Sequence, residues 1–426
     1  MPDGTATAHL YRPKLLTTFR EGYRLDDLRG DAAAGLTVAV IALPLSMAIA
    51  VASGVSPDRG LYAAIVGGFL VSALGGSRFQ IGGPAGAFIV LVAATAAKFG
   101  VSGLLTAVLM SGALLTLLGL LRLGSLVRHI PHAVTVGFTG AIAVTILASQ
   151  LKDLGGLRLA GAEPVPLGPK LMALAESAGT FSPLAFAVGA GVAALILGVR
   201  RWRPAWPGML IAIALASIGA WALRLPVETI GDRFGALPSG LPVPALPDLS
   251  PAALLRLAPA ALTFTLLGAV ESLLSAKVAD GMTGRVHRSN MELVAQGLAN
   301  VASALFGGIC VTGTIARTAA NVRAGARSPV AGLLHAVFLL LFVAVAAPLA
   351  GFIPMAALAG VLLVVAWNMA EKAEFLRLLR DWRTALVLLA TFAVTLAHDL
   401  SAGIIAGCLT AAALALFGRR VAAEGP

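Results

Sequence analysis

Long apolar runs are the feature of this sequence that most restricts its fold. Residues 32–52, 104–121, 133–149 and 331–349 contain no Asp, Glu, Lys or Arg, and each run is close to the roughly 20 residues that cross a hydrocarbon core. Over 426 residues, 58% are hydrophobic and 12% are charged, whereas a soluble domain carries about 25% charged residues. The runs are continuous and do not alternate as barrel strands do, so helices satisfy the backbone. We therefore expect an all-α polytopic membrane protein.

Fourteen membrane segments are predicted from these runs and their interruptions. The third and tenth segments are too short and too rich in glycine to span a bilayer as complete helices, so we expect each to contain a half-helix. The segments are 31–52, 61–76, 84–98, 103–121, 131–151, 183–199, 206–223, 257–278, 292–307, 314–323, 329–348, 353–369, 383–397 and 401–418.

The basic residues predict the orientation. The net charge is +11, but Lys and Arg collect in the leader and in short loops between apolar segments, which is a topology signal and no indication of nucleic acid binding. When fourteen segments are counted, every dense basic cluster falls on one side. We therefore expect a multi-pass protein of the bacterial inner membrane with both termini in the cytoplasm.

A weak internal repeat divides the chain into two halves. Residues 42–44 and 53–55 align with 269–271 and 280–282 at one offset of 227, and the glycine pair at 75–76 has a counterpart at 307–308. Because seven segments is an odd number, two such halves face opposite ways. Inverted repeats of this kind are characteristic of secondary transporters.

Two glycine-rich stretches are the predicted binding site. Residues 80–88 read QIGGPAGAF and residues 307–317 read GGICVTGTIAR. Extended backbone followed by a helix start inside the membrane leaves N–H groups and a positive dipole end free for an anion. The alternative is close helix packing through small residues.

Two charged residues within apolar segments extend this hypothesis. Arg317 lies one turn into the second helix start, where a guanidinium adds positive potential and a planar donor fork; the alternative is a structural ion pair or a side chain that reaches the cytoplasm. Glu271 lies mid-segment, where a carboxyl can carry a proton; the alternatives are a fixed hydrogen-bonded role or pairing with Lys277. Pro44 is expected to kink the first segment, which leaves Leu45 and Ile49 to line the site.

The chain resembles the sulfate permease family, also called solute carrier family 26. The motifs that carry the resemblance are GLTVAVIALP at 35–44, GLYAA at 60–64, Gly83-Pro84, ELVAQGLAN at 292–300 and ARTAANVRAGARSP at 316–329. The similarity covers about residues 25–418.

This resemblance implies seven-plus-seven inverted repeats in the uracil-permease-like fold, with a core domain that moves against a gate domain. The implied substrate-binding residues are Leu45, Ile49, Ala85, Gly86, Ala87, Thr314, Ala316 and Arg317. The implied organisation is a cytoplasmic segment at 1–30, core parts at 31–125 and 257–350, gate parts at 126–224 and 351–418, an extracellular loop at 225–256 and a cytoplasmic end at 419–426. Relatives usually continue into a regulatory STAS domain, which we expect to be absent here, and a homodimer is possible.

The expected function is secondary transport of a small anion together with a proton, with a dicarboxylate such as fumarate ranked first. Sulfate, or exchange of bicarbonate and chloride, remains the alternative, as does a channel-like anion conductor. A nucleobase permease of the same fold is less favoured, because Arg317 stands where those proteins carry a carboxylate. The resemblance implies sodium binding by an Asp at the position of Glu271 in some relatives, and the longer Glu favours a proton. No enzyme activity, cofactor or metal is expected.

Overall fold

The computed structural model describes residues 11–124, 131–161, 163–164, 167–204, 206–398 and 400–423. The expected boundary at 125–126 lies outside these residues, as do residues 1–10 and 424–426 of the predicted terminal segments. The described chain is predominantly helical. Seven of its helices are long and apolar enough to cross a membrane, namely Leu25–Ala52, Gly86–Leu120, His132–Gly155, Pro183–Trp202, Pro251–Thr283, Val330–Ala350 and Met355–Leu378.

The first half of the chain contains the elements α2 to α11. In order they are α2 (Lys14–Arg20), α3 (Leu25–Ala52), α4 (Pro57–Tyr62), the π-helical turn η2 (Ala63–Gly67), α5 (Gly68–Leu74), β1 (Gly82–Gly83), the 3-10 turn η3 (Gly86–Phe88), α6 (Ile89–Leu120), α8 (His132–Gly155), α9 (Leu167–Glu176), η4 (Ala178–Thr180), α10 (Pro183–Trp202) and α11 (Gly208–Ala222).

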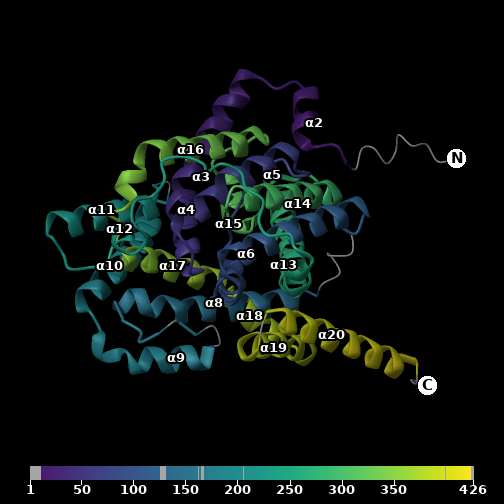
Figure 1. The fold of residues 1–426 in the computed structure, drawn as a ribbon. Coiled ribbons are helices and arrows are strands. Elements are labelled where there is room, and N and C mark those ends of the chain that lie inside the picture. Colours follow the sequence, from purple (N-terminus) through teal and green to yellow (C-terminus); the bar gives the residue numbers. More distant parts are fainter. Residues whose placement is uncertain are drawn as a thin grey trace.

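The second half contains α12 to α20. These are α12 (Ile230–Phe234), α13 (Pro251–Thr283), α14 (Ser289–Leu305), β2 (Thr312–Gly313), α15 (Ile315–Arg323), α16 (Val330–Ala350), α17 (Met355–Met369), α18 (Lys372–Leu378), α19 (Trp382–Ala397) and α20 (Leu400–Ala423). Figure 1 labels most of these elements along the coloured chain.

Several expected segments take another form in the structure. The third and fourth run together as α6, which kinks at Gly100, a residue with φ of 70°. The second is interrupted by the π turn η2, whereas the tenth, expected as a short segment at 314–323, contains the nine residues of α15. Length and composition therefore single out seven helices, and the count of fourteen segments stays a prediction.

Local sequence explains where many helices begin. Proline occupies the first turn of α4, α10 and α13, where its missing N–H costs no hydrogen bond. Ser182 accepts a hydrogen bond from the backbone of Ala185, and Asp381 accepts one from Thr384. Such caps satisfy amides that a helix start would otherwise leave free.

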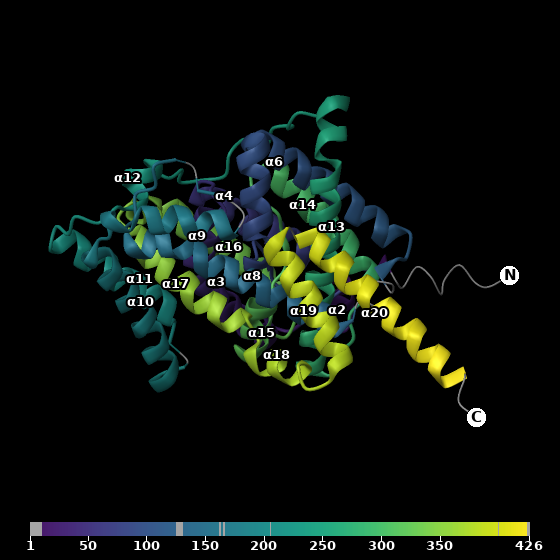
Figure 2. The same cartoon turned by 90° about the horizontal axis from the view of Figure 1, so that it is seen from below.

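The helices pack as two sets. In the first, α6 lies against α13 and α14, and α3 lies against α16; in the second, α8 lies against α17 and α19, and α10 lies against α17. Figure 1 shows the first set around α3, α6 and α13 to α16, with α10 and α17 to its left and α8, α9 and α18 to α20 below it. Seen from below in Figure 2, α19 and α20 run side by side, and α20 extends past the bundle.

The first set contains a close crossing of two glycines. A Cβ added to Gly297 of α14 would lie 2.5 Å from the carbonyl oxygen of Gly112 in α6, and one added to Gly112 would lie 2.6 Å from the carbonyl oxygen of Gly297. Small residues allow the two backbones to approach in this way. The crossing joins α6 of the first half to α14 of the second.

The first turns of α3 are tied to the chain that follows α15. The buried carboxylate of Asp31 accepts hydrogen bonds from the Tyr23 hydroxyl at 2.9 Å and from the backbone N–H of Arg327 at 2.7 Å and of Ser328 at 3.0 Å. The Arg327 guanidinium also forms an ion pair with the partly buried Asp27 at 2.9 Å. These contacts fix the connection between α15 and α16.

Candidate functional site

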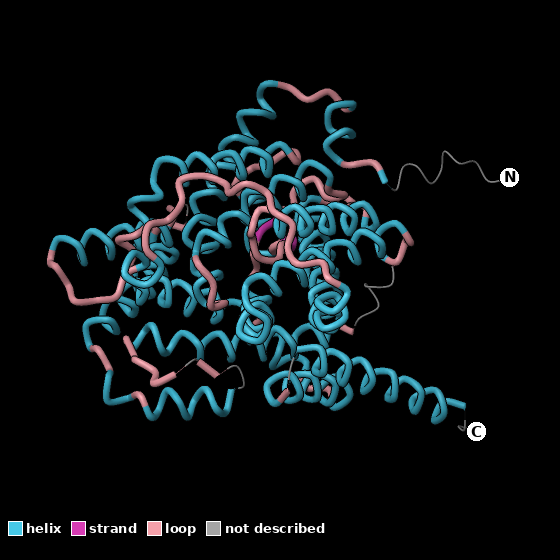
Figure 3. Tube along the Cα trace, in the orientation of Figure 1, coloured by secondary structure: helices cyan, strands magenta, loops and turns pink. Residues whose placement is uncertain are grey.

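Two short strands cross in the middle of the helices and are followed at once by helix starts. β1 and β2 pair antiparallel, with Gly82 opposite Gly313 and Gly83 opposite Thr312, and Figure 3 shows the pair surrounded by helices. The backbone N–H of Thr314 also donates to the carbonyl of Ile81 at 3.0 Å. The chain then turns into η3 after β1 and into α15 after β2.

Neither helix start carries a side-chain cap. The residues before η3 and α15, Ala85 and Thr314, both have extended backbone and accept no capping hydrogen bond through their side chains. The first N–H groups of a helix lack partners inside the helix. Two uncapped starts held together by the strand pair therefore offer N–H donors and positive dipole ends to an anion.

The structure exposes two of the predicted site residues and buries the others. Ala316 is exposed and Gly86 is partly exposed. The remaining predicted contacts have relative exposures below 10% and are Leu45, Ile49, Ala85, Ala87, Thr314 and Arg317. A Cβ on Gly86 would lie 3.6 Å from Sδ of Met369 in α17 and 3.9 Å from Cδ1 of Ile146 in α8. The first helix start thus faces side chains of the second helical set, which the sequence pattern did not identify.

Arg317 lies behind the strands and has a relative exposure of 1%. Its Nη2 donates to the carbonyl of Pro84 at 2.5 Å, and its Nε and Nη1 have no hydrogen-bond partner among the described residues. A Cβ on Gly83 would lie 2.4 Å from Nη1. Only glycine fits at this position, and its φ of 153° is unfavourable for other residues as well. The predicted donor fork therefore bonds to the backbone of the first helix start and is closed off from open space.

Serines of α13 hold the strand pair from one side. Ser272 bonds through its hydroxyl to Thr312 Oγ1 at 2.8 Å and accepts from the N–H of Gly313 at 3.3 Å. One turn later, the Ser275 hydroxyl donates to Thr318 Oγ1 at 3.0 Å. Sequence reasoning missed both serines, although two hydroxyls one helical turn apart, next to Glu271, were the available signal.

Asn300 of α14 holds the start of the second strand from the other side. Its amide donates to the carbonyl of Val311 at 2.7 Å and accepts from the N–H of Val311 at 2.8 Å. A side chain that replaces a backbone partner in both directions fixes the path of the strand. The residue lies in a motif that carried the family resemblance, but its role was not predicted from the sequence.

Glu271 lies beside these serines on α13 and has a relative exposure of 8%. Within the described chain, no hydrogen bond or ion pair involves its carboxylate, and Lys277 is exposed and forms no ion pair with it. The pairing with Lys277 considered from the sequence is therefore not seen. The side chain is buried without a fixed partner, which is the environment in which a carboxyl exchanges a proton with its surroundings.

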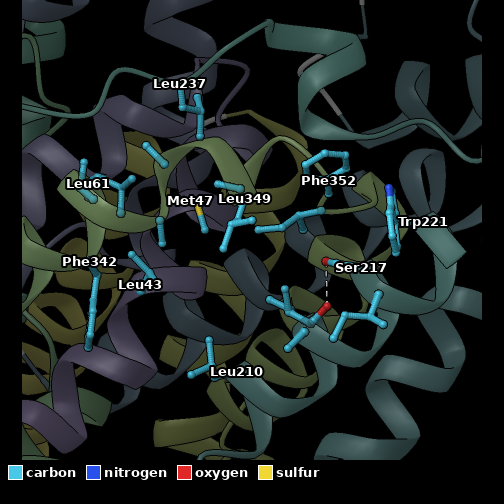
Figure 4. A pocket seen from close by; sticks show the side chains of 18 of the residues that line it. Leu43, Met47, Leu61, Leu210, Ser217, Trp221, Leu237, Phe342, Leu349 and Phe352 are labelled. Atoms are coloured by element: carbon cyan, nitrogen blue, oxygen red, sulfur yellow. Dashed lines mark hydrogen bonds between the residues drawn. The ribbon is translucent and has the colours of Figure 1, made fainter.

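An apolar cavity of about 560 Å³ lies elsewhere, between α3, α11 and α16. Figure 4 shows Leu43, Met47, Phe342, Leu349 and other apolar side chains around it. Its one hydroxyl, that of Ser217, donates to the carbonyl of Ile213 in the same helix at 2.8 Å. Such a lining cannot replace the hydration of an anion, so this cavity is unsuited to an anionic substrate.

Comparison with known proteins finds relatives from one family. The model of the sulfate permease family matches residues 28–393. The putative sulfate transporter YvdB of Bacillus subtilis is 42% identical over 394 residues, which cover 92% of this chain and 74% of that protein. The bicarbonate transporter BicA of Picosynechococcus is 31% identical over 405 residues, covering 92% and 70%.

Solved structures have the same fold. The transmembrane domain of a cyanobacterial BicA superposes with a TM-score of 0.81 at 31% identity, covering 90% of this chain and 98% of that one. SLC26A9 superposes with a TM-score of 0.88 over 97% of this chain and 69% of that one, at 18% identity. The second likeness concerns the fold alone.

Proposed function

Because this chain belongs to the sulfate permease family, whose members are transporters and not enzymes, we propose that it is a secondary transporter that carries a small inorganic oxyanion across the bacterial inner membrane. The observation that carries the proposal is the pair of uncapped helix starts joined by β1 and β2. Backbone N–H groups at helix N-termini bind oxyanions without a dedicated cationic side chain.

Sulfate and bicarbonate are the favoured substrates. The relatives that match over most of this chain are named as sulfate or bicarbonate transporters, so the inorganic alternative is better supported than the dicarboxylate that the sequence ranked first. The space beside Gly86 also argues for a small anion, because Met369 and Ile146 lie close to that turn.

Proton coupling through Glu271 is part of the proposal. An ionised Glu271 repels an anion bound nearby, and protonation removes that repulsion, so the two binding events favour each other. The absence of a fixed partner for its carboxylate in the described chain supports this role over a purely structural one.

The working cycle that we propose is movement of a core against a gate. The core comprises 31–125 and 257–350 and the gate comprises 126–224 and 351–418, with fourteen segments in two inverted repeats. Support comes from the packing, because α6 lies against α13 and α14 and α3 lies against α16, while α8 lies against α17 and α19 and α10 lies against α17.

The proposed function is tested by uptake into proteoliposomes at a clamped membrane potential. ³⁵S-labelled sulfate and ¹⁴C-labelled bicarbonate are supplied outside, with ¹⁴C-labelled fumarate in a parallel series, and the outside is made acidic. We expect sulfate to accumulate above its equilibrium level, whereas a channel would only equilibrate it. Bicarbonate uptake is counted only above that of empty liposomes, because acid converts bicarbonate to CO2, which crosses the bilayer unaided. Uptake of none of the three anions above empty liposomes would refute the proposal.

A further inference from the structure

A polar cavity of about 700 Å³ lies next to the first helix start, on the side away from α2 and α15. Its walls come from the end of α3 at 51–54, the first turns of α6, α8 and the segment that follows α8, with α9 and α12 completing it. Ile89, which directly follows η3, is one of the lining residues. The cavity therefore ends at the first residue of α6, directly after the turn that contains Gly86.

Lys170 lines this cavity, and its amine is held by two contacts. Lys170 belongs to α9 and has a relative exposure of 6%. Its Nζ lies 2.5 Å from Oγ of Ser149 in α8 and 2.8 Å from a carboxylate oxygen of Glu163. An ammonium has three donors, and the described structure provides partners for two of them. A buried ammonium with an unused donor is an anchor for an anion.

The other charges around the cavity leave a positive excess. Four cationic side chains line it against three carboxylates, and these are Lys152, Arg158, Lys170 and Arg233 against Asp153, Glu163 and Glu228. Arg233 is committed to Asp153 at 2.7 Å and to Glu228 at 2.5 Å. Lys152 and Arg158 form no ion pair with the described residues, so their charges act on whatever enters the cavity.

We propose that this cavity is an outer docking site for the oxyanion, with Lys170 as its anchor. The proposal rests on the proposed transport function and on the predicted orientation, which places the segments after α8 outside. An anion would bind here first and then pass Ile89 to reach the helix starts. Glu163 limits the strength of the site because it neutralises part of the charge of Lys170.

A docking site of this kind changes how readily the substrate binds and not how fast the bound substrate is transported. Low-dielectric walls around an excess of one charge raise the local concentration of the opposite ion, so removing a cation raises KM and leaves the maximal rate unchanged. Salt weakens the effect, because the Debye length falls from about 30 Å at 0.01 M to about 8 Å at 0.15 M.

The test compares two substitutions with opposite expected signs in right-side-out membrane vesicles, with ³⁵S-labelled sulfate and ¹⁴C-labelled bicarbonate as probes. Lys170→Gln keeps a hydrogen-bonding side chain but loses the charge, and we expect a KM at least about threefold higher at low salt. Glu163→Gln should lower KM. Both differences should shrink when potassium gluconate is raised to about 0.3 M.

Controls separate docking from folding and from the transport proposal itself. Lys277→Gln removes the same charge from an exposed position of α13 and should leave KM unchanged, and Lys170→Arg should retain the wild-type KM if charge is what matters. Changes in the same direction for Lys170→Gln and Glu163→Gln, or a KM within twofold of wild type for both in monodisperse protein, would overturn the docking site while transport stands. If the wild-type protein itself takes up neither anion, the proposed transport function is refuted instead.

Discussion

Arg317 illustrates how a single charge can act on a binding site without lining it. Its guanidinium is buried behind the strand pair and donates to the carbonyl of Pro84, directly before the first helix start. A fixed positive charge at this place raises the potential at both helix starts, and the surrounding apolar side chains screen it poorly. The hydrogen bond from Arg317 in α15 to Pro84 thus joins the two helix starts.

Replacing Arg317 with Ala should weaken sulfate binding by about 2 kcal/mol, or roughly 30-fold, because a charge-assisted bond and the local potential are lost together. The measurement is a thermal-shift titration of purified protein with sulfate. Arg323→Ala provides the matched control, since Arg323 is exposed at the other end of α15. Equal sulfate affinity in wild type and a monodisperse Arg317→Ala protein would rule out the role.

Glu271→Gln tests the coupling mechanism. Glutamine resembles the protonated carboxyl and keeps its hydrogen-bonding capacity, so anion binding and exchange of labelled for unlabelled substrate should persist. Accumulation driven by a proton gradient should disappear, and with it the rise in uptake as external pH falls. Glu176→Gln, an exposed carboxyl of α9, should behave as wild type. If Glu271→Gln accumulates substrate with the wild-type pH dependence, the coupling group lies elsewhere.

At the scale of elements, the approach of α6 and α14 decides how rigidly the two halves of the chain are joined. The helices meet backbone to backbone at Gly112 and Gly297, and α14 in turn supplies Asn300, which fixes the start of β2. A change in the spacing of these helices would therefore be transmitted to the second strand.

Gly297→Ala should lower the apparent Tm by several degrees, because its Cβ would meet the Gly112 carbonyl oxygen and the Thr116 N–H at 2.5 Å, and neither backbone can move aside cheaply. Gly191→Ala in α10 is the control, since nothing lies within 4 Å of the added Cβ and alanine favours a helix by about 1 kcal/mol. A Gly297→Ala protein as stable as Gly191→Ala would show that the crossing is loosely packed.

The sequence allows some features of these elements to be predicted and not others, and the difference has a physical cause. Glycine and proline are local signals, so the extended stretches at 80–88 and 307–317 and the helix starts behind them could be anticipated. The register of β1 with β2 joins segments far apart in the chain, and no local pattern specifies it. The hydrogen bond from Nη2 of Arg317 to the carbonyl of Pro84 also joins the two distant segments, and no local pattern indicates it. The predicted contact of Arg317 with the anion stays a prediction.

At the scale of the molecule, the contact between the two helical sets near Gly86 is the place where movement can be tested. A Cβ at Gly86 would lie 3.6 Å from Sδ of Met369, so the start of η3 and the end of α17 face each other closely. Alternating access requires one set to move past the other, which would change this separation.

Linking Gly86→Cys to Met369→Cys with a short reversible bifunctional thiol reagent should therefore block transport, and a reductant should restore it. The background carries Cys310→Ser and Cys408→Ser, which removes both native thiols. Gly208→Cys with Val199→Cys is the control, because the two Cβ atoms lie 3.3 Å apart in α10 and α11, both within the proposed gate part 126–224, and linking them should leave transport intact. Continued uptake after complete linkage of the first pair would contradict the movement.

The strand pair also has a kinetic consequence. β1 and β2 share backbone hydrogen bonds, and Thr314 donates to Ile81. The two helix starts therefore form one rigid unit and bind a single anion together. The protein then has a single loading event per turnover, and its saturation curve should be hyperbolic with a Hill coefficient close to one. Any sigmoidal response to substrate would have to originate outside the two helix starts.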